Sequence, residues 1–500
     1  MTSESEPRYE EAAGPLAGTP SGPYRLGWAL LLGPILCVVP WLVPAPLALP
    51  PEAWRLTGLL AWIVLWWMTE AVPLPVTSLL PLPLMPLLGI ASEREIAASY
   101  AHPLIFLFLG GFFIAAAMQR WALHRRIALT IVAAIGTSPA RIVGGFMLAT
   151  AGLSMWISNT ATAVMMASVG TALIAFLESR EVEAGQLRPF AVALLLGIAY
   201  AASIGGVATL IGTPPNALLA SVLSQTYGIE IGFAEWMLLG VPVALVMIPL
   251  AWLALVKLVF RLGRAELPVA RAMLAEERAR LGPMGRGERA VLIIFVLTAV
   301  GWILRKPLVA VTGLNISDTG IAMMGALAAF MVPVSLARGQ FVLDWETARR
   351  IPWGVLLLFG GGLAIATAFR VTGLADAIGH SVGGLGQVPI AAMILIITIT
   401  IVILTELTSN TATTATFLPI LAAVAIGLEI SPLLLCVPVA LAASMAFMMP
   451  VATPPNAIVF AYSGLRIGDM LRAGLVLNII AVIIIYAAVT QIVPRIFSGL

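Results

Sequence analysis

Four apolar stretches of this chain are too long to be single membrane-spanning helices, and this feature constrains the fold most. They cover residues 142–177, 189–224, 388–428 and 432–463. As one straight helix the first stretch would be about 52 Å long, whereas the hydrocarbon core of a bilayer is about 30 Å thick. Each stretch must therefore fold back on itself or break inside the membrane.

The charge content excludes a soluble protein in which these stretches form the core. Only 10% of the 500 residues are charged and 60% are apolar, whereas soluble domains carry about 25% charged residues. The composition predicts an all-α polytopic membrane protein of the plasma membrane, which is the inner membrane if the source is a bacterium. Simple spans of about 20 residues are expected at 26–48, 53–69, 73–91, 103–120, 236–260, 289–304, 318–336, 351–369 and 469–494.

A polar triplet lies near the middle of two of the long stretches. Ser158-Asn159-Thr160 divides the stretch 142–177, and Ser409-Asn410-Thr411 divides the stretch 388–428. Ser, Asn and Thr side chains compete with the helix backbone for hydrogen bonds, so they favour a cap or a turn over a helix interior. We therefore predict two re-entrant hairpins, at about 140–178 and 388–428, with the triplets at their tips.

A double proline interrupts each of the other two long stretches. The two segments are Gly212-Thr213-Pro214-Pro215-Asn216 and Ala452-Thr453-Pro454-Pro455-Asn456. Consecutive prolines remove two backbone donors and disfavour helix in the residue before each of them. We therefore predict two broken helices, at about 189–224 and 432–463. Their exposed backbone must be buried in protein or line a wet cavity.

These features recur in the same order in both halves of the chain. The second polar triplet follows the first by 251 residues, and the second double-proline motif follows the first by 240. Counting from a cytoplasmic N-terminus gives about 11 transmembrane helices and two repeats of inverted topology. This topology places most of the 27 Lys and Arg residues on the cytoplasmic side, as the positive-inside rule requires.

The topology divides the chain into five parts. The first 25 residues are rich in Ser, Glu, Pro and Gly, which is typical of disorder. We expect a disordered cytoplasmic tail at 1–25, a first transmembrane helix at 26–48, a first repeat at 49–260, a cytoplasmic linker at 261–288 and a second repeat at 289–494.

Inverted repeats with paired broken elements are typical of secondary transporters, whose binding site lies near the bilayer midplane. Asn amides, Ser and Thr hydroxyls and the free N–H groups of helix N-termini can hold an anion. Side-chain oxygens and freed carbonyls suit a hard cation. Because neither 142–177 nor 388–428 contains Arg or Lys, a bound cation is the simplest source of compensating charge. We therefore expect cation-coupled transport of an anion.

Other classes of function find little support in the sequence. The three histidines share no spacing and the two cysteines lie in apolar runs, so a metal cluster is not expected. No HExxH motif, Ser–His pair or pair of carboxylates on facing spans is present, which argues against an intramembrane enzyme. The charges are scattered rather than gathered on one face, so no nucleic-acid partner is expected.

Three segments closely resemble the motifs of the divalent anion:sodium symporter (DASS) family. They are Leu153–Thr162, Thr405–Thr413 and Val451–Ala457, and the resemblance extends over residues 26–494. It implies a homodimer in the lipid bilayer and an elevator-type motion, in which a transport part moves against a scaffold. It also implies Na⁺ as the transported coupling ion. The substrate would be a small divalent or trivalent anion. It would be either a C4 dicarboxylate such as succinate, or citrate, or sulfate.

The resemblance also implies two sodium sites and one substrate site. One Na⁺ would be held by Ser154, Ser158, Asn159 and the Gly212 carbonyl. The second would be held by Asn410 and the backbone of Thr405, Thr408 and Ala452. The substrate would contact Ser158, Asn159, Thr160, Ser409, Asn410, Thr411, Thr453 and Pro454.

Two alternative transport mechanisms stay open at this level. Some DASS relatives exchange anions without sodium and place fixed positive charge near the site, and none stands beside either triplet here. Glu406 is an intramembrane carboxylate, which makes it a functional candidate by default. It could carry a proton in a proton-coupled permease, contribute to a cation site, or support the structure.

Overall fold

The computed structural model describes residues 27–46, 49–136, 138–179, 184–263, 268–381 and 388–497. These residues are almost entirely helical, and a short antiparallel pair of strands joins Pro333–Ser335 to Gln340–Phe341. The cytoplasmic tail predicted at 1–25 lies outside the described residues.

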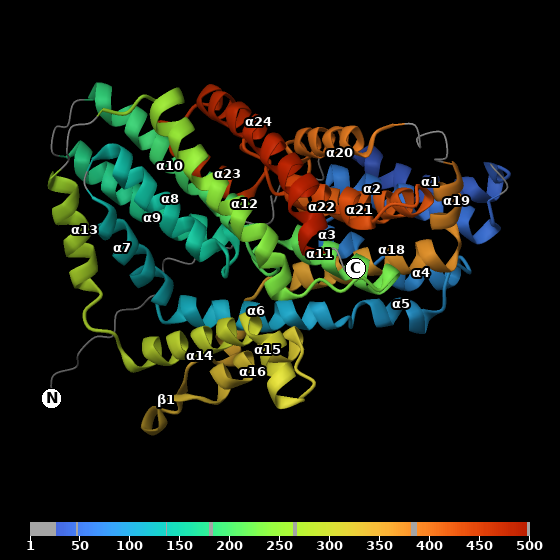
Figure 1. Ribbon diagram of the computed structural model, residues 1–500, viewed down its shortest axis with the longest axis horizontal. Helices are drawn as coiled ribbons and strands as arrows, with labels where there is room; N and C mark the ends of the chain where they lie inside the picture. The colour runs from blue at the N-terminus through green and yellow to red at the C-terminus, as the bar shows by residue number, and fades with distance from the viewer. Residues whose placement is uncertain are drawn as a thin grey trace.

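The first half of the chain, up to residue 280, is built from helices (Figure 1). They are α1 (Gly27–Leu42), α2 (Pro51–Thr69), α3 (Leu74–Thr77), α4 (Pro81–Leu87), α5 (Glu93–Ser99), α6 (Pro103–Arg120), α7 (Leu123–Ile135), α8 (Pro139–Ser154), α9 (Asn159–Glu178), α10 (Ala184–Gly206), α11 (Pro214–Tyr227), α12 (Phe233–Leu253), a π-helical continuation of α12 (Ala254–Val259) and α13 (Pro268–Arg280).

The second half consists of helices and the short pair of strands. It contains α14 (Arg286–Ile303), α15 (Arg305–Thr312), α16 (Asp318–Met331), β1 (Pro333–Ser335), a 3₁₀ turn (Leu336–Arg338), β2 (Gln340–Phe341), α17 (Trp345–Ala348), α18 (Trp353–Val371), α19 (Leu374–Ser381), α20 (Ile390–Thr405), α21 (Asn410–Gly427), α22 (Pro432–Ala443), α23 (Pro454–Phe460), α24 (Ile467–Gln491) and α25 (Val493–Ile496).

Several of these helices are long and apolar enough to cross a membrane. Within the described residues there are seven such helices, or up to eight if the bent pair of α14 and α15 counts as one span. The pair is bent by 75°. Five further apolar helices are shorter, at 10–17 residues. The polytopic all-α class is thus confirmed, while the count of about 11 spans stays a prediction.

The double prolines begin new helices instead of bending existing ones. The helix α10 ends at Gly206 and α11 begins at Pro214, while α22 ends at Ala443 and α23 begins at Pro454. Proline suits the first position of a helix because its missing N–H would have no partner there. Both broken helices of the prediction are therefore present, and we call the non-helical segments 207–213 and 444–453 break 1 and break 2.

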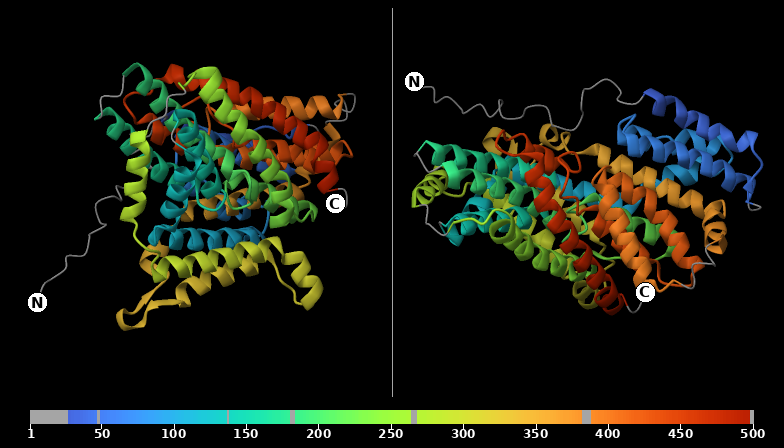
Figure 2. Two further views of the ribbon diagram at one scale, coloured as in Figure 1. Left: turned by 60° about the vertical axis from the view of Figure 1, so that its left-hand side comes forward. Right: turned by 90° about the horizontal axis from the view of Figure 1, so that it is seen from above.

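Two helix–turn–helix units lie in different parts of the molecule. Figure 1 shows α8 and α9 towards the left and α20 and α21 towards the right, and the view from above in Figure 2 keeps this separation. The turns between the paired helices contain Ser158 and Ser409. Ser158 and Ser409 stand in these turns, and the other two residues of each triplet begin the following helix.

The two halves are interlocked by the way these helices pack. The first arm of each unit packs on its own half, α8 on α10 and α20 on α22. The second arm also reaches the other half, because α9 packs against α23 and α21 packs against α11. The helices that follow the double prolines thus pack mainly on the other repeat, α11 on α18, α21 and α22, and α23 on α9 and α10.

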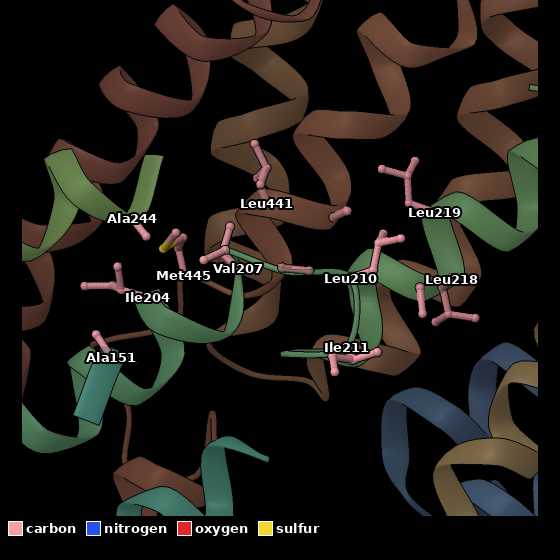
Figure 3. Packing of buried hydrophobic residues seen from close by; sticks show 14 of the residues in the cluster. Ala151, Ile204, Val207, Leu210, Ile211, Leu218, Leu219, Ala244, Leu441 and Met445 are labelled. Carbon is pink, nitrogen blue, oxygen red and sulfur yellow. The ribbon is translucent and has the colours of Figure 1, made fainter. Parts of the chain in front are cut away.

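Break 1 lies in the apolar interior of the protein. Val207, Leu210 and Ile211 of break 1 belong to the same cluster of buried side chains as Leu441 and Met445 (Figure 3). Break 1 has no side chain that is substantially exposed, and Val207 is fully buried. Its irregular backbone is therefore shielded from lipid by protein, as membrane depth requires.

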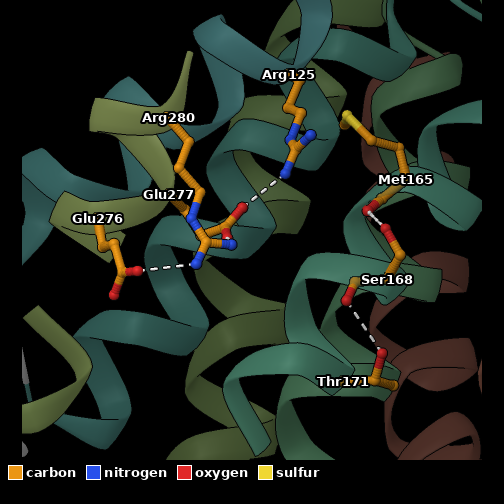
Figure 4. A network of polar contacts seen from close by, with 7 residues as sticks. All are labelled: Arg125, Met165, Ser168, Thr171, Glu276, Glu277 and Arg280. Atoms are coloured by element: carbon orange, nitrogen blue, oxygen red, sulfur yellow. Dashed lines mark hydrogen bonds and ion pairs between the residues drawn. The ribbon is translucent and has the colours of Figure 1, made fainter. Parts of the chain in front are cut away.

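The segment predicted as a cytoplasmic linker contains the charged helix α13. Arg125 of α7 forms an ion pair with Glu277 of α13 at 2.6 Å, and Arg280 pairs with Glu276 and Glu277 within α13 (Figure 4). These contacts hold α13 against α7, and α13 also packs on α9. Such exposed pairs add little stability individually, so they orient the helix more than they stabilise it.

Candidate transport site

Both polar triplets lie at helix N-termini. Ser158 caps α9, and its hydroxyl accepts a hydrogen bond from the Ala161 N–H at 3.3 Å. Ser409 occupies the same capping position before α21. Asn159 and Asn410 are consequently the first residues of their helices, where free N–H groups and the helix dipole favour an anion.

Oxygen atoms gather around Asn159 in the first half. The Ser154 hydroxyl donates to the Ala202 carbonyl at 2.7 Å. With its amide nitrogen turned inward, Asn159 donates to Ser154 Oγ at 2.6 Å, Ala202 O at 3.1 Å and Gly212 O at 3.3 Å. With its amide oxygen turned inward instead, this oxygen would lie 2.6–3.3 Å from the same three oxygens, which gives a group of four. An all-oxygen set of this kind suits a hard cation.

The second half repeats this arrangement at the equivalent positions. The Thr405 hydroxyl lies 2.7 Å from Asn410 Oδ1 and 2.8 Å from the Ala443 carbonyl. Thr405 and Asn410 each follow their counterparts Ser154 and Asn159 by 251 residues. The structure therefore brings one hairpin tip and one broken helix together in each half.

The remaining sequence-predicted residues have more local contacts. The Thr408 hydroxyl bonds within its own hairpin, to Leu404 O at 2.9 Å and to Thr413 Oγ1 at 2.7 Å. The Thr453 hydroxyl caps α23 by accepting the Asn456 N–H at 3.2 Å. Thr160, Thr411 and Pro454 lie in the first turns of α9, α21 and α23, beside the capped N-termini.

The asparagine of each double-proline motif has a role that the sequence did not predict. The Asn216 side-chain N–H groups donate to the carbonyls of Gly206 and Val207, both at 3.2 Å, and of Thr209 at 2.8 Å. Asn456 donates in the same way to Ala446 and Met449, both at 3.0 Å. Each asparagine thereby satisfies carbonyls that the break removes from the helix ladder. The recurrence of Asn after both double prolines was the available signal.

Glu406 is buried and is surrounded by N–H donors. Its carboxylate accepts the backbone N–H groups of Phe447, Met448 and Met449, at 2.7–3.0 Å, and the Asn478 side-chain amide at 2.7 Å. Only 5% of Glu406 is exposed. Of the uses left open by the sequence, structural support is the one that these contacts favour, because both oxygens are engaged with break 2.

Trp156, next to the first triplet, is packed among aromatic rings. Its ring stacks on Trp302 and Phe233, with centroids 6.3 and 6.0 Å apart, and meets Phe295 edge-on at 5.1 Å. Trp302 and Phe295 belong to α14, so the first hairpin tip rests against a helix outside the interlocked hairpins and breaks. These contacts identify Trp156 as a packing residue.

Comparison with known proteins agrees with this architecture. Residues 25–494 match the family model described as the sodium:sulfate symporter transmembrane region. The sodium-dependent dicarboxylate transporter SdcS of Staphylococcus saprophyticus is 41% identical over 477 residues, which cover 94% of this chain and 92% of the relative. SdcS of Staphylococcus aureus strain USA300 is 40% identical over 472 residues, covering 93% and 91%.

Two solved structures share the fold at low sequence identity. The Alcanivorax borkumensis YdaH transporter superimposes with a TM-score of 0.56 at 14% identity, covering 81% of this chain and 88% of that one. Neisseria gonorrhoeae MtrF gives 0.57 at 12% identity, covering 94% and 95%. With a family match across nearly the whole chain and relatives at 40% identity, this protein belongs to the sodium:sulfate symporter family, the DASS family of the sequence prediction, and is a membrane transporter rather than an enzyme.

Proposed function

We propose that the protein is a sodium-coupled symporter of a small dicarboxylate, a C4 anion such as succinate. The observation that carries the proposal is the pair of equivalent oxygen clusters, one around Asn159 and one around Asn410, each beside a helix N-terminus. Each cluster is suited to one Na⁺. The two N-termini between them offer N–H groups and hydroxyls to the two carboxylates of the substrate.

The charge balance supports coupling of the two ions. The four long apolar stretches contain no Arg or Lys, and Glu406 is their one charged side chain. A dianion entering this region would meet no fixed positive charge, and an unpaired charge in a low-dielectric site is strongly disfavoured. Two bound Na⁺ ions would neutralise the dianion. Sodium binding therefore raises the affinity for the substrate, and the converse holds by linkage.

The names of the relatives agree with sodium as the coupling ion and a dicarboxylate as the substrate. The two SdcS proteins are named sodium-dependent dicarboxylate transporters and cover more than nine-tenths of this chain at about 40% identity. The family description names sulfate instead, so sulfate is the second substrate to test. In line with the family resemblance we extend the proposal to a homodimer with a cytoplasmic N-terminus, working by an elevator-type motion. The interlocked hairpins and breaks would form the moving part.

The proposal is tested by uptake into proteoliposomes. With an inward Na⁺ gradient, labelled succinate should accumulate above its external concentration, and replacement of Na⁺ by K⁺ or choline should abolish accumulation. Unlabelled succinate, citrate and sulfate added as competitors rank the substrates. Uptake that ignores Na⁺ but requires an anion inside would identify an exchanger. Uptake that follows a pH gradient without Na⁺ would identify proton coupling, and either result would overturn the proposal.

A further inference from the structure

The two halves tie their hairpin tip to their break at the same pair of positions. Met155 and Glu406 each follow the first residue of an oxygen cluster and lie 251 residues apart. Thr209 and Met449 each lie three residues before the carbonyl assigned to sodium and are 240 residues apart. In both halves the first position of the pair is hydrogen-bonded to the second. The chemistry of the bond differs between the halves.

In the first half the bond is made by a hydroxyl. The Thr209 hydroxyl donates to the Met155 carbonyl at the hairpin tip and accepts the Gly212 N–H at 3.1 Å. The Thr209 carbonyl in turn accepts the Asn216 amide at 2.8 Å. Thr209 is fully buried. The Thr209 side chain therefore links the hairpin tip to Gly212, whose carbonyl faces Asn159.

In the second half the bond is made by a carboxylate. Glu406 accepts the Met449 N–H at 2.9 Å, and Met449 O accepts the Ala452 N–H at 3.2 Å. Met449 O also accepts the Asn456 amide at 3.0 Å. Asn478 of α24 donates to the same carboxylate at 2.7 Å and so fixes its position. The path from the hairpin tip to Ala452 again runs through one side chain.

We propose that Thr209 and the Glu406–Asn478 pair are positioning residues, each of which sets the geometry of one sodium site. They fix the distance between the hairpin tip and the backbone that completes the site, Gly212 in one half and Ala452 in the other. A binding constellation tolerates displacement of about 0.5 Å, and these bonds are what prevents a larger one. The inference rests on the proposed sodium coupling. It adds residues that do not themselves bind the ion.

The first link is a neutral hydroxyl and the second is a carboxylate, so the second link has an additional electrostatic effect. Glu406 is the one charged side chain in the four long apolar stretches, and it directly follows Thr405 of the second oxygen cluster. A carboxylate near this cluster favours a cation there, whereas Thr209 contributes no charge. We therefore expect the second sodium site to depend more strongly on Glu406 than the first site depends on Thr209.

The test measures the sodium dependence of succinate uptake in Thr209→Val, Asn478→Leu and Glu406→Gln. Each change keeps the size of the side chain but removes the bond or the charge. The Na⁺ concentration for half-maximal uptake should rise roughly tenfold, which corresponds to about 1.4 kcal/mol, and most in Glu406→Gln. The rate at saturating Na⁺ should fall much less. Thr398→Val is the matched control, because this buried hydroxyl bonds only to Ile394 O of its own helix among the described residues, at 2.6 Å.

A second readout covers variants that fold poorly. Purified protein in detergent is heated over a range of Na⁺ concentrations without substrate, because binding to the folded state raises apparent stability by mass action. The Na⁺ concentration that gives half of the stabilisation should rise in the three variants and not in Thr398→Val. Loss of rate or of stability with an unchanged sodium dependence would overturn the positioning role. Wild-type uptake that does not depend on Na⁺ would overturn the proposed function itself, and the two failures are thus distinguishable.

Discussion

Removal of the asparagine after each double proline should destabilise the corresponding break. In Asn216→Ala the carbonyls of Gly206, Val207 and Thr209 lose a donor, and in Asn456→Ala those of Ala446 and Met449 do. A buried polar group left without a partner costs about 1–3 kcal/mol. Val207 O keeps the Trp236 Nε1–H and Met449 O keeps the Ala452 N–H as donors, so each variant should lose about 1–3 kcal/mol.

The assay is the temperature at which half of the detergent-solubilised protein is lost from the monodisperse peak. Both alanine variants should show a clear drop relative to wild type. Aspartate separates the hydrogen bonds from simple packing, because Asn216→Asp keeps the volume but turns an acceptor towards three carbonyls. We expect Asp to be worse than Ala at both positions, since like partial charges then face each other in a buried site. Aspartate variants as stable as wild type would refute the reasoning.

Four further substitutions test other parts of the structure. Asn159→Ala and Asn410→Ala should each abolish sodium-driven uptake while the purified protein stays monodisperse, and wild-type uptake rates would contradict the site. Gly474→Ala places a Cβ 2.3 Å from the Phe447 carbonyl, so thermal stability should fall by about 1–3 kcal/mol from overpacking; an unchanged melting temperature would show that α24 can move away. Gln225→Leu removes the amide that joins α11 to α5 and α18, and heating assays should register a loss of about 1 kcal/mol.

The hairpin tips and the breaks could be predicted because local chemistry decides them. Ser158 caps α9 with its hydroxyl and Ser409 takes the N-cap position of α21, the position that serine prefers in any context. Pro214 and Pro454 became the first residues of helices for an equally local reason. The spacing of these motifs also predicted the repeat. The caps and the helix starts needed only a few neighbouring residues, whereas the repeat needed the comparison of motifs 240 and 251 residues apart.

The contacts between distant segments could not be predicted in this way. Hydropathy does not say that Glu406 meets three backbone N–H groups some forty residues away, nor that the carbonyls of Ala202 and Ala443 join the oxygen clusters, since a backbone group has no sequence signature. The bend after Ile303 was not predictable from the sequence either. It brings Arg305 to Asp318 at 2.9 Å and Lys306 to Glu235, and pairings across such separations follow from the tertiary structure.

The packing of α9 on α23 and of α21 on α11 has a consequence for how such a protein can be built and can change. Neither half expressed alone would supply the packing for its helix after the double proline, because α11 packs on α18, α21 and α22 and α23 packs on α9 and α10. A gene cut into two should therefore work only when both products meet in the same bilayer. A substitution on α23 is accommodated or resisted by a hairpin encoded nearly three hundred residues earlier, so changes in the two halves are energetically coupled.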